Sequence, residues 1–397
     1  MMRIFILTGE PSGDAHGAYL AQTLRTLAPE VRLSGVGGTR MRQAGVDLIA
    51  SSEHWGAIGI PEALRKVPGL WVQMQRLVRQ LLADPPDVLV LIDFGAFNVR
   101  LLRRLRGHGI RTVYYIPPGS WSRHRAPGAL PFLVDAIATP FPWSAENLRK
   151  AGAPAPILWV GHPLLDYLQQ RAATRADARA ALGIADTRPV VALVPGSRRK
   201  EVRLLLPVFF AALRRLHPTP LCLLAVAPSI GEETVRRMAP ADLDIRYLDG
   251  LAYDALPAAD AALVASGTAT LELACLGVPM VVAYRGTSAD WVQYQLLRRS
   301  GALQHIALPN ILAEDFVVPE LLQHAANPEG LAATLLPLLE HSPARDRQLQ
   351  AFAAIRSWLG DGEATRRTAQ LVLHVAAATT PEIPEPPAAS IPAAPSA

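Results

Sequence analysis

Short apolar runs alternate along the chain with longer stretches in which apolar residues recur every three or four positions. Runs of this kind are typical of buried strands, and the longer periodicity is typical of amphipathic helices. In the first part of the chain the pattern predicts helices over Asp14–Leu27, Arg40–Ala44 and Val99–Arg106. It predicts strands at Arg3–Thr8, Val31–Gly35, Val88–Ile92, Thr112–Ile116, Ala136–Thr139 and Ile157–Val160. Strands that alternate with helices favour a parallel sheet covered by helices on both faces.

The alternation restarts after Gly161-His162-Pro163, with predicted helices over Leu164–Leu182 and Val202–His217. Further strands are predicted at Pro189–Val194, Leu221–Val226, Asp244–Leu248, Ala261–Val264 and Met280–Ala283. We therefore predict an α/β protein of two doubly wound domains, residues 1–163 and 164–345. A helix over 346–378 is expected to pack back across both domains. Residues 379–397, which contain six prolines, are expected to be a disordered tail.

The composition excludes several classes of protein and leaves the predicted fold unchanged. Half of the 397 residues are hydrophobic and 18% are charged, which indicates large folded cores. The net charge of +5 is not gathered in basic blocks, so we expect no nucleic-acid partner but an anionic ligand or an anionic membrane surface. The two cysteines and the scattered histidines and acids show no metal-ligand spacing, so we expect neither a metal nor a cofactor. No signal peptide and no apolar run of about 18 residues is seen, which favours a soluble or peripheral protein.

Three loops follow predicted strands at the edge of the sheet where ligands bind in such folds. The first, Gly9-Glu10-Pro11-Ser12-Gly13-Asp14, opens a helix whose free N–H groups suit an anion or a sugar oxygen. Ser12 and Asp14 are equally good helix caps, so a capped helix start without a ligand stays open as the alternative.

The second loop, Pro195-Gly196-Ser197-Arg198, suits a diphosphate, because a glycine turn, a helix start and a guanidinium come together. The alternative is a basic, solvated helix cap. The loop lacks the Gly-Lys-Ser/Thr of a P-loop, which argues against an NTPase.

The third loop, Ser266-Gly267-Thr268, can hold phosphate oxygens through its hydroxyl and backbone N–H groups. Glu272 follows on a helix, where its carboxylate either accepts ribose hydroxyls or simply complements the helix dipole.

Asp93, at the end of an apolar strand, is a candidate general base, and a helix cap or an ion-pair partner is the alternative. His16 and His162 are weaker candidates for the same task. Trp71, Met74, Leu77, Val78 and Leu81 share one helical face near Lys66, Arg76 and Arg79. This face either lies on anionic lipid or packs on the sheet.

Taken together, these motifs resemble the lipid-A-disaccharide synthase family over about residues 2–370. The segments that carry the resemblance are Gly9-Glu10-Pro11-Ser12-Gly13-Asp14, Gly35-Val36-Gly37-Gly38-Thr39-Arg40-Met41, Ile92-Asp93 with Phe97-Asn98, Gly161-His162-Pro163, Pro195-Gly196-Ser197-Arg198 with Glu201-Val202, Ser266-Gly267-Thr268-Ala269-Thr270-Leu271-Glu272 and Leu308-Pro309-Asn310. Each is weak alone, but their order and spacing are specific.

The resemblance implies a GT-B fold, in which two Rossmann-like domains face a central cleft. It implies an inverting, metal-independent transfer from UDP-2,3-diacylglucosamine to 2,3-diacylglucosamine 1-phosphate, which yields a β-1,6-linked disaccharide phosphate and UDP. Members of the family resemble cytoplasmic proteins that attach peripherally to the inner membrane. Whether this chain forms a homodimer is left open.

The resemblance also implies roles for single residues. Arg198 and the Gly196-Ser197 turn would neutralise the leaving diphosphate, and Asp93 would take the acceptor proton. The other UDP-sugar contacts implied are Ser12, Gly13, Ser266, Gly267, Thr268, Glu272 and Asn310.

Two segments depart from the family pattern. Where the family reads Ile-Asp-x-Pro-Asp-Phe-Asn, this chain has Ile92-Asp93-Phe94-Gly95-Ala96-Phe97-Asn98, so one acidic residue is missing. The family's Ser-Pro-x-x-Trp-Ala-Trp-Arg is replaced by Pro117-Pro118-Gly119-Ser120-Trp121-Ser122-Arg123. A UDP-sugar epimerase, another UDP-GlcNAc-type glycosyltransferase and a degenerate nucleotide-sugar-binding protein are the alternative functions.

Overall fold

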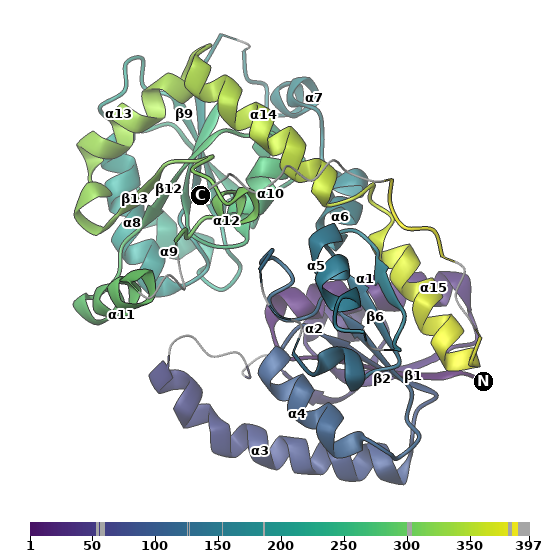
Figure 1. The fold of residues 1–397 in the computed structure, drawn as a ribbon. Helices are drawn as coiled ribbons and strands as arrows, with labels where there is room; N and C mark the ends of the chain where they lie inside the picture. The colour runs from purple at the N-terminus through teal and green to yellow at the C-terminus, as the bar shows by residue number, and fades with distance from the viewer. Residues whose placement is uncertain are drawn as a thin grey trace. The chain divides into compact units, whose positions relative to one another are not determined.

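The computed structural model describes residues 1–52, 55, 60–124, 126, 128–152, 154–185, 187–299, 304–379 and 383–387. The chain divides into two compact units (Figure 1). Unit 1 comprises Met1–Asp166 and Trp358–Ser390, and Tyr167–Ser357 belong to unit 2. The division falls at Asp166, three residues beyond the predicted boundary.

Unit 1 is built on a seven-stranded parallel sheet with the order β3-β2-β1-β4-β5-β6-β7. Its strands are β1 (Arg3–Thr8), β2 (Arg32–Gly37), β3 (Asp47–Ser51), β4 (Val88–Ile92), β5 (Thr112–Tyr115), β6 (Ala136–Thr139) and β7 (Ile157–Trp159). Inner strands β4 and β5 are buried along their whole length because helices cover both faces of the sheet. Edge strand β3 was not predicted, since its residues are half-buried or exposed and include Asp47.

The helices that begin in unit 1 are α1 (Pro11–Leu27), α2 (Thr39–Gln43), α3 (Ile60–Ala83), α4 (Gly95–Leu105), α5 (Pro142–Arg149), α6 (Pro163–Arg171) and α15 (Ala364–Ala377). Helices α1 and α15 cover one face of the sheet, where Leu24 and Val372 join the same core. Helices α3, α4 and α5 contribute Leu77, Leu101 and Leu148 to the core on the other face.

Unit 2 has a six-stranded parallel sheet with the order β10-β9-β8-β11-β12-β13. Its strands are β8 (Val190–Val194), β9 (Leu221–Val226), β10 (Ile245–Asp249), β11 (Ala261–Ala265), β12 (Met280–Tyr284) and β13 (Glu320–Leu322). Its helices are α7 (Arg175–Ala181), α8 (Arg199–Leu213), α9 (Glu232–Arg236), α10 (Ala269–Cys275), α11 (Ser288–Arg299), α12 (Leu308–Ala313), α13 (Pro328–Leu339) and α14 (Pro343–Trp358). Single 3₁₀ turns lie at Leu130–Phe132 in unit 1 and at Leu256–Ala258 and Gln323–Ala325 in unit 2. The prediction of two doubly wound α/β domains is confirmed.

Two helices predicted as continuous are each divided in two. The predicted helix over 164–182 breaks into α6 and α7, because Thr174 adopts an extended backbone and its hydroxyl caps α7 by accepting the N–H of Asp177. The predicted helix over 346–378 breaks into α14 and α15 at Gly360 and Gly362, both of which have positive φ.

Five residues of the predicted disordered tail, 383–387, lie against unit 1. The Glu385 carboxylate pairs with Arg149 and accepts the backbone N–H of Trp159 on edge strand β7 at 3.0 Å. Pro386 is buried, and the Pro384 carbonyl accepts a hydrogen bond from Arg367. The rest of the predicted tail beyond Thr379 lies outside the described residues.

Candidate functional site

The strand order of each sheet reverses beside its first strand, which is where open α/β sheets bind ligands. In unit 1, β1 lies between β2 and β4, and in unit 2, β8 lies between β9 and β11. The turns that follow β1 and β4, and those that follow β8 and β11, are therefore neighbours. All three loops singled out in the sequence, together with Asp93, lie at these positions.

In unit 2 the two predicted phosphate-binding turns lie side by side. Strand β8 pairs with β11 so that Val194 is opposite Val264, and the next residues leave the sheet together. Gly196 has φ +101, and a Cβ placed there would lie 3.5 Å from the Cβ of Ala265. The Gly196-Ser197 and Ser266-Gly267 turns thus form one continuous edge.

Arg198 precedes the first residue of α8, and its guanidinium pairs with Glu201 at 2.6 Å. The Arg198 side chain is 53% exposed, whereas that of Glu201 is only 17% exposed, so the buried acid holds the arginine. Glycine is favoured at position 196 because its φ of +101 is strained for other residues, and a Cβ there would also lie 2.5 Å from a Glu201 carboxylate oxygen. This pair orients the remaining N–H groups of the guanidinium.

The third loop is held from behind by a hydrogen-bond network. The Ser266 hydroxyl donates to the Ile306 carbonyl at 2.7 Å, and the Thr270 hydroxyl donates to the Gly267 carbonyl and accepts the N–H of Leu308. Ser266 is half-buried, while Gly267 and Thr268 are exposed. The backbone of this turn is therefore fixed, and the hydroxyl of Thr268 faces solvent.

Asn310 lies behind this loop rather than on its exposed edge. It is fully buried, and its amide nitrogen donates to the Val318 carbonyl and to Glu320. Its amide oxygen accepts the N–H of Val318 at 2.8 Å. Glu320 also accepts the N–H groups of Ile306 and Ala307, so these side chains hold the segment that supports the third loop.

Glu272 lies on α10 and is half-buried, and one of its carboxylate oxygens accepts the hydroxyl of Tyr253 at 2.6 Å. This bond fixes the carboxylate in one orientation. Sequence reasoning missed Tyr253, because the residue precedes β11 and belongs to none of the three loops.

In unit 1, Asp93 follows β4 in an unusual conformation. Asp93 and Phe94 both have positive φ, +47 and +49, which is rare for residues other than glycine. The turn is fixed because the Asp93 carbonyl accepts both the Tyr114 hydroxyl at 2.6 Å and the Asn98 amide at 2.7 Å. Among the described residues the Asp93 carboxylate has no ion-pair partner. Phe94, not Asp93, is the N-cap residue of α4.

The electrostatic environment of Asp93 suits a proton acceptor. Burial, and after it the nearby carboxylate of Glu10, raise the pKa of its carboxyl to about 6. Glu10 is brought there by the sheet, because β1 and β4 pair with Thr8 opposite Ile92. The two turns touch, since a Cβ on Gly9 would lie 2.3 Å from the Phe94 ring. The sequence analysis did not assign Glu10 a role.

The other residues of the first loop serve mainly the fold. A Cβ on buried Gly13 would lie 2.0 Å from the Thr8 hydroxyl, so the glycine is required by packing. The Asp14 carboxylate accepts the N–H groups of Gly38, Arg40 and Met41 and so caps α2 instead of its own helix. Ser12 is exposed within α1, whose N-cap is Glu10. Ser12 and Gly13 lie in unit 1, whereas the other predicted UDP-sugar residues lie in unit 2.

The two candidate histidines lie half-buried beside each other in unit 1, with ring centroids 6.3 Å apart. Burial lowers the pKa of His16 to about 4 and that of His162 to about 3. The Nδ1 atom of His162 accepts the N–H of Leu164. Both side chains are therefore neutral near pH 7. Within the described ranges, no group of three His, Cys, Asp or Glu side chains is arranged to hold a metal ion.

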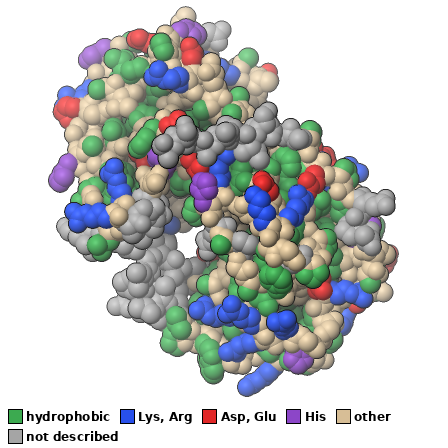
Figure 2. Space-filling model, in the orientation of Figure 1, with side chains coloured by type: hydrophobic (Ala, Val, Ile, Leu, Met, Phe, Trp, Pro, Cys, Tyr) green, Lys and Arg blue, Asp and Glu red, His purple; other side chains and the backbone are tan. Residues whose placement is uncertain are grey.

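The predicted amphipathic helix α3 is buried along one part of its length and exposed along another. Met74, Leu77 and Leu81 are buried in the core of unit 1. Val67, Trp71 and Val72 are 54%, 56% and 43% exposed. Figure 2 shows Lys and Arg side chains gathered beside apolar ones on the face of unit 1 over α3 and α4. The side chain of Lys66 lies outside the described part, and no described helix has the length and hydropathy to cross a bilayer.

Comparison with known sequences places the chain among relatives of similar length. Residues 4–374 match the family model described as lipid-A-disaccharide synthetase. The lipid-A-disaccharide synthase of Geobacter sulfurreducens is 35% identical over 378 residues, which cover 94% of this chain and 97% of that protein. The corresponding protein of Azotobacter vinelandii is 39% identical over 386 residues, with 95% and 98% coverage.

Solved structures with the same fold are much more distant in sequence. MurG of Acinetobacter baumannii superposes with a TM-score of 0.57 at 17% identity, covering 94% of this chain and 99% of that one. The calicheamicin glycosyltransferase CalG4 superposes with a TM-score of 0.61 at 13% identity, covering 96% of this chain and 100% of that one. UDP-GlcNAc 2-epimerase from Neisseria meningitidis, bound to UDP-GlcNAc, superposes with a TM-score of 0.57 at 12% identity, covering 94% of this chain and 100% of that one. These likenesses confirm the predicted GT-B fold, which transferases and epimerases share.

Proposed function

Because this chain belongs to the lipid-A-disaccharide synthetase family, we propose that its two units divide one glycosyl transfer between them. The chain is a hexosyltransferase of lipid A biosynthesis, as predicted. Unit 2 binds UDP-2,3-diacylglucosamine, and unit 1 supplies the base for 2,3-diacylglucosamine 1-phosphate. The observation that carries this assignment is the pair of adjoining turns after β8 and β11, with Arg198 at their edge.

Bond making and bond breaking follow from the chemistry of the two substrates. The 6-hydroxyl of the acceptor loses its proton to Asp93, and its oxygen bonds to the anomeric carbon of the donor. The bond from that carbon to the UDP oxygen breaks, and UDP leaves with the electron pair. Attack from the face opposite UDP inverts the anomeric centre.

Arg198 neutralises the diphosphate as it leaves, together with the N–H groups at the start of α8. Preorganised donors that face a developing charge are commonly the largest contribution to catalysis. The Glu201 pair supports this role because it fixes the guanidinium before the substrate binds. Transfer is then independent of divalent ions and continues in excess chelator.

The remaining donor contacts are assigned to Ser197, Ser266, Gly267 and Thr268 on the phosphates and to Glu272 on the ribose. The Tyr253 hydroxyl supports this role of Glu272 because its hydrogen bond orients the carboxylate. Asn310 acts through the loop it supports, since all three of its amide contacts are within the chain. Ser12 and Gly13 contribute through the first loop of unit 1.

Asp93 is assigned as the general base because its pKa of about 6 lies close to neutral pH, where a base is most effective. His16 and His162, with pKa values lowered to about 4 and about 3, are weaker bases than Asp93. Asp93 also carries this task without the second acidic residue of the family pattern, which is Ala96 here.

Attachment to the cytoplasmic face of the inner membrane is proposed for α3. The exposed Val67, Trp71 and Val72 would enter the interface, and the arginines of α3 and α4 would meet anionic headgroups. A homodimer stays a prediction.

The test is to incubate the purified chain with both acylated substrates and to identify the products by mass spectrometry. Disaccharide phosphate and stoichiometric UDP are expected. Epimerised donor would support the alternative that the fold shares with its epimerase neighbours, and unchanged but bound donor would support a degenerate binding protein.

Two variants test proton transfer from the acceptor and stabilisation of the leaving diphosphate separately. Asp93→Asn is expected to abolish transfer and to leave UDP affinity, measured by calorimetry, unchanged. Arg198→Ala is expected to lower kcat by about 10²-fold or more, because a donor to the developing charge is lost. A loss of UDP affinity in Asp93→Asn would instead place this residue in the donor site or the fold.

A further inference from the structure

Unit 1 contains two adjoining hollows that begin beside the turn of Asp93. The first, of about 350 Å³, is lined by Gly95, Ala96, Val99, Arg100, Arg103 and Pro118. The second, of about 210 Å³, lies under the loop that follows β5. Val99 and Pro118 line both hollows, so the two lie next to each other. The first starts only two residues after the proposed base.

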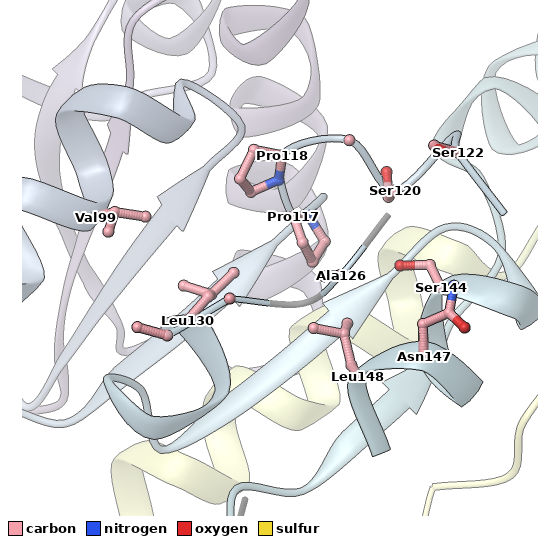
Figure 3. Close-up of a pocket in the computed structure, with 13 residues that line it drawn as sticks. Val99, Pro117, Pro118, Ser120, Ser122, Ala126, Leu130, Ser144, Asn147 and Leu148 are labelled. Carbon is pink, nitrogen blue, oxygen red and sulfur yellow. The ribbon is translucent and has the colours of Figure 1, made fainter. Parts of the chain in front are cut away.

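The second hollow has an apolar wall and a polar rim (Figure 3). Val99, Leu130 and Leu148 form the apolar side, and the two leucines are almost fully buried. Ser120 and Ser122 lie on the opposite side. Within the described part of the chain, neither serine hydroxyl has a hydrogen-bond partner, so both are available to a ligand.

The mouth beside α4 is positively charged. Arg100 and Arg103 are exposed on adjacent turns of this helix, and among the described residues neither pairs with a carboxylate. Two guanidinium groups beside an apolar hollow match a molecule that carries a phosphate and a hydrocarbon chain.

The loop that closes the second hollow is firmly attached to the unit. The guanidinium of Arg123 lies 4.5 Å from the centre of the Trp143 ring and 4.8 Å from that of Trp358. The indole N–H of Trp143 donates to the Ser120 carbonyl, and the Asn147 amide donates to the Arg123 carbonyl. The hollow is therefore a preformed site, which lowers the entropic cost of binding.

From these observations we propose that the adjoining hollows bind the acylated sugar phosphate acceptor. Its phosphate lies at Arg100 and Arg103, and one acyl chain enters the cavity of Val99, Leu130 and Leu148. The inference rests on the proposed function and extends it, because it makes Val99 a residue that sets acceptor chain length.

The experiment uses acceptors with acyl chains short enough to stay monomeric in water, so that transfer out of a micelle does not obscure binding. Burial of each methylene from water is expected to lower the acceptor KM by up to about four-fold until the cavity is full. Val99→Phe fills the space shared by the hollows, so this dependence on chain length should disappear while the donor KM stays unchanged. Ala129→Leu narrows the cavity from the exposed loop and should act in the same direction if Val99→Phe fails to fold.

A second arm tests the charged mouth. The double variant Arg100→Ala, Arg103→Ala is expected to raise the KM of the phosphorylated acceptor at least ten-fold and to leave that of its dephosphorylated analogue unchanged. Arg104→Ala removes the same charge from the same helix but lies outside both hollows, and it should have no effect.

The outcomes separate the inference from the function on which it rests. Two results would overturn the acyl site while transfer persists. One is a wild-type acceptor KM that does not vary with chain length. The other is a rise of the acceptor KM in Val99→Phe that is the same for all chain lengths. If the wild-type chain makes no disaccharide from any acceptor, the proposed function fails and the acyl site fails with it.

Discussion

The conformation of Asp93 combines backbone strain with an unfavourable charge environment. Two consecutive residues with positive φ are held by hydrogen bonds from Tyr114 and Asn98 to one carbonyl. Burial and a second carboxylate both oppose ionisation of its side chain. Such features persist where the surrounding fold imposes them, and they are typical of functional sites.

The role of Glu10 can be tested through the pH dependence of the reaction. Its negative charge raises the pKa of Asp93, so Glu10→Gln should lower that pKa. The acidic limb of kcat/KM, which reports the base of the free enzyme, should then move to lower pH. A residue with a merely structural role would change the rate at every pH without moving this limb.

The matched control is Glu30→Gln, which removes the same charge from an exposed position in unit 1. Its pH profile should coincide with that of the wild-type chain. An unmoved acidic limb in Glu10→Gln would show that Glu10 does not tune the base.

Single residues were predicted from the sequence where their neighbours along the chain define the chemistry. Arg198 and the Gly196 turn could be proposed because a glycine, a helix start and a guanidinium follow one another. Glu10 was missed because its effect on Asp93 depends on the pairing of β1 with β4, across a separation of more than 80 residues. For Asn310, the family motif located the residue but could not show that Glu320 and Val318 occupy its amide.

At the scale of elements, α3 shows how one helix can serve two environments. Its C-terminal half is anchored by Leu77 and Leu81, while its middle turns present Trp71 and Val72 to solvent. The sequence pattern correctly placed five apolar residues on one face. It could not show where along that face the sheet ends, because this depends on how far the neighbouring strands extend.

The two parts of α3 should respond differently to a polar substitution. Trp71→Ser is expected to weaken sedimentation with anionic vesicles several-fold, because about half of the indole is exposed and available to lipid. Its transfer rate in detergent and its Tm should remain close to wild type. Leu77→Ser should instead destabilise unit 1 by about 2–5 kcal/mol, as expected for the loss of a buried leucine.

Vesicle binding of Trp71→Ser equal to wild type would remove this part of α3 from the membrane contact. Vesicles without anionic lipid serve as the reference for the charge contribution of the arginines.

Element boundaries were predicted best where both faces of a strand are buried. Strands β1, β4, β6 and β9 were predicted with the bounds that the structure has, since each contains an apolar run that stands out from its neighbours in the sequence. Helices α1 and α4 begin three and four residues earlier than predicted, because their first turns consist of Pro, Gly and small residues without periodicity. Their early starts bring the first loop and the hollow of Gly95 to the sheet edge.

At the scale of the whole molecule, unit 1 is completed by the far end of the chain. Helix α15 covers the same sheet face as α1, with Leu371 and Val372 fully buried. Burial of each such side chain is worth about 1.5–3 kcal/mol, so residues 1–166 alone lack a large part of their core. Unit 2 has its own sheet and core within Tyr167–Ser357.

This division predicts different behaviour of the two parts when they are produced separately. A fragment of residues 163–357 should unfold cooperatively on heating and bind UDP with an affinity close to that of the full chain. A fragment of residues 1–166 should be insoluble unless residues 358–390 are supplied. Absence of a cooperative transition in the first fragment would show that unit 2 depends on unit 1.

The late position of α15 has a consequence for synthesis. The first 166 residues leave the ribosome with one apolar sheet face uncovered, and α15 begins only at Ala364. At the usual rates of translation, the nascent sheet waits roughly 10–40 s for this helix. During that interval the second unit can fold completely, while this face of the first remains uncovered.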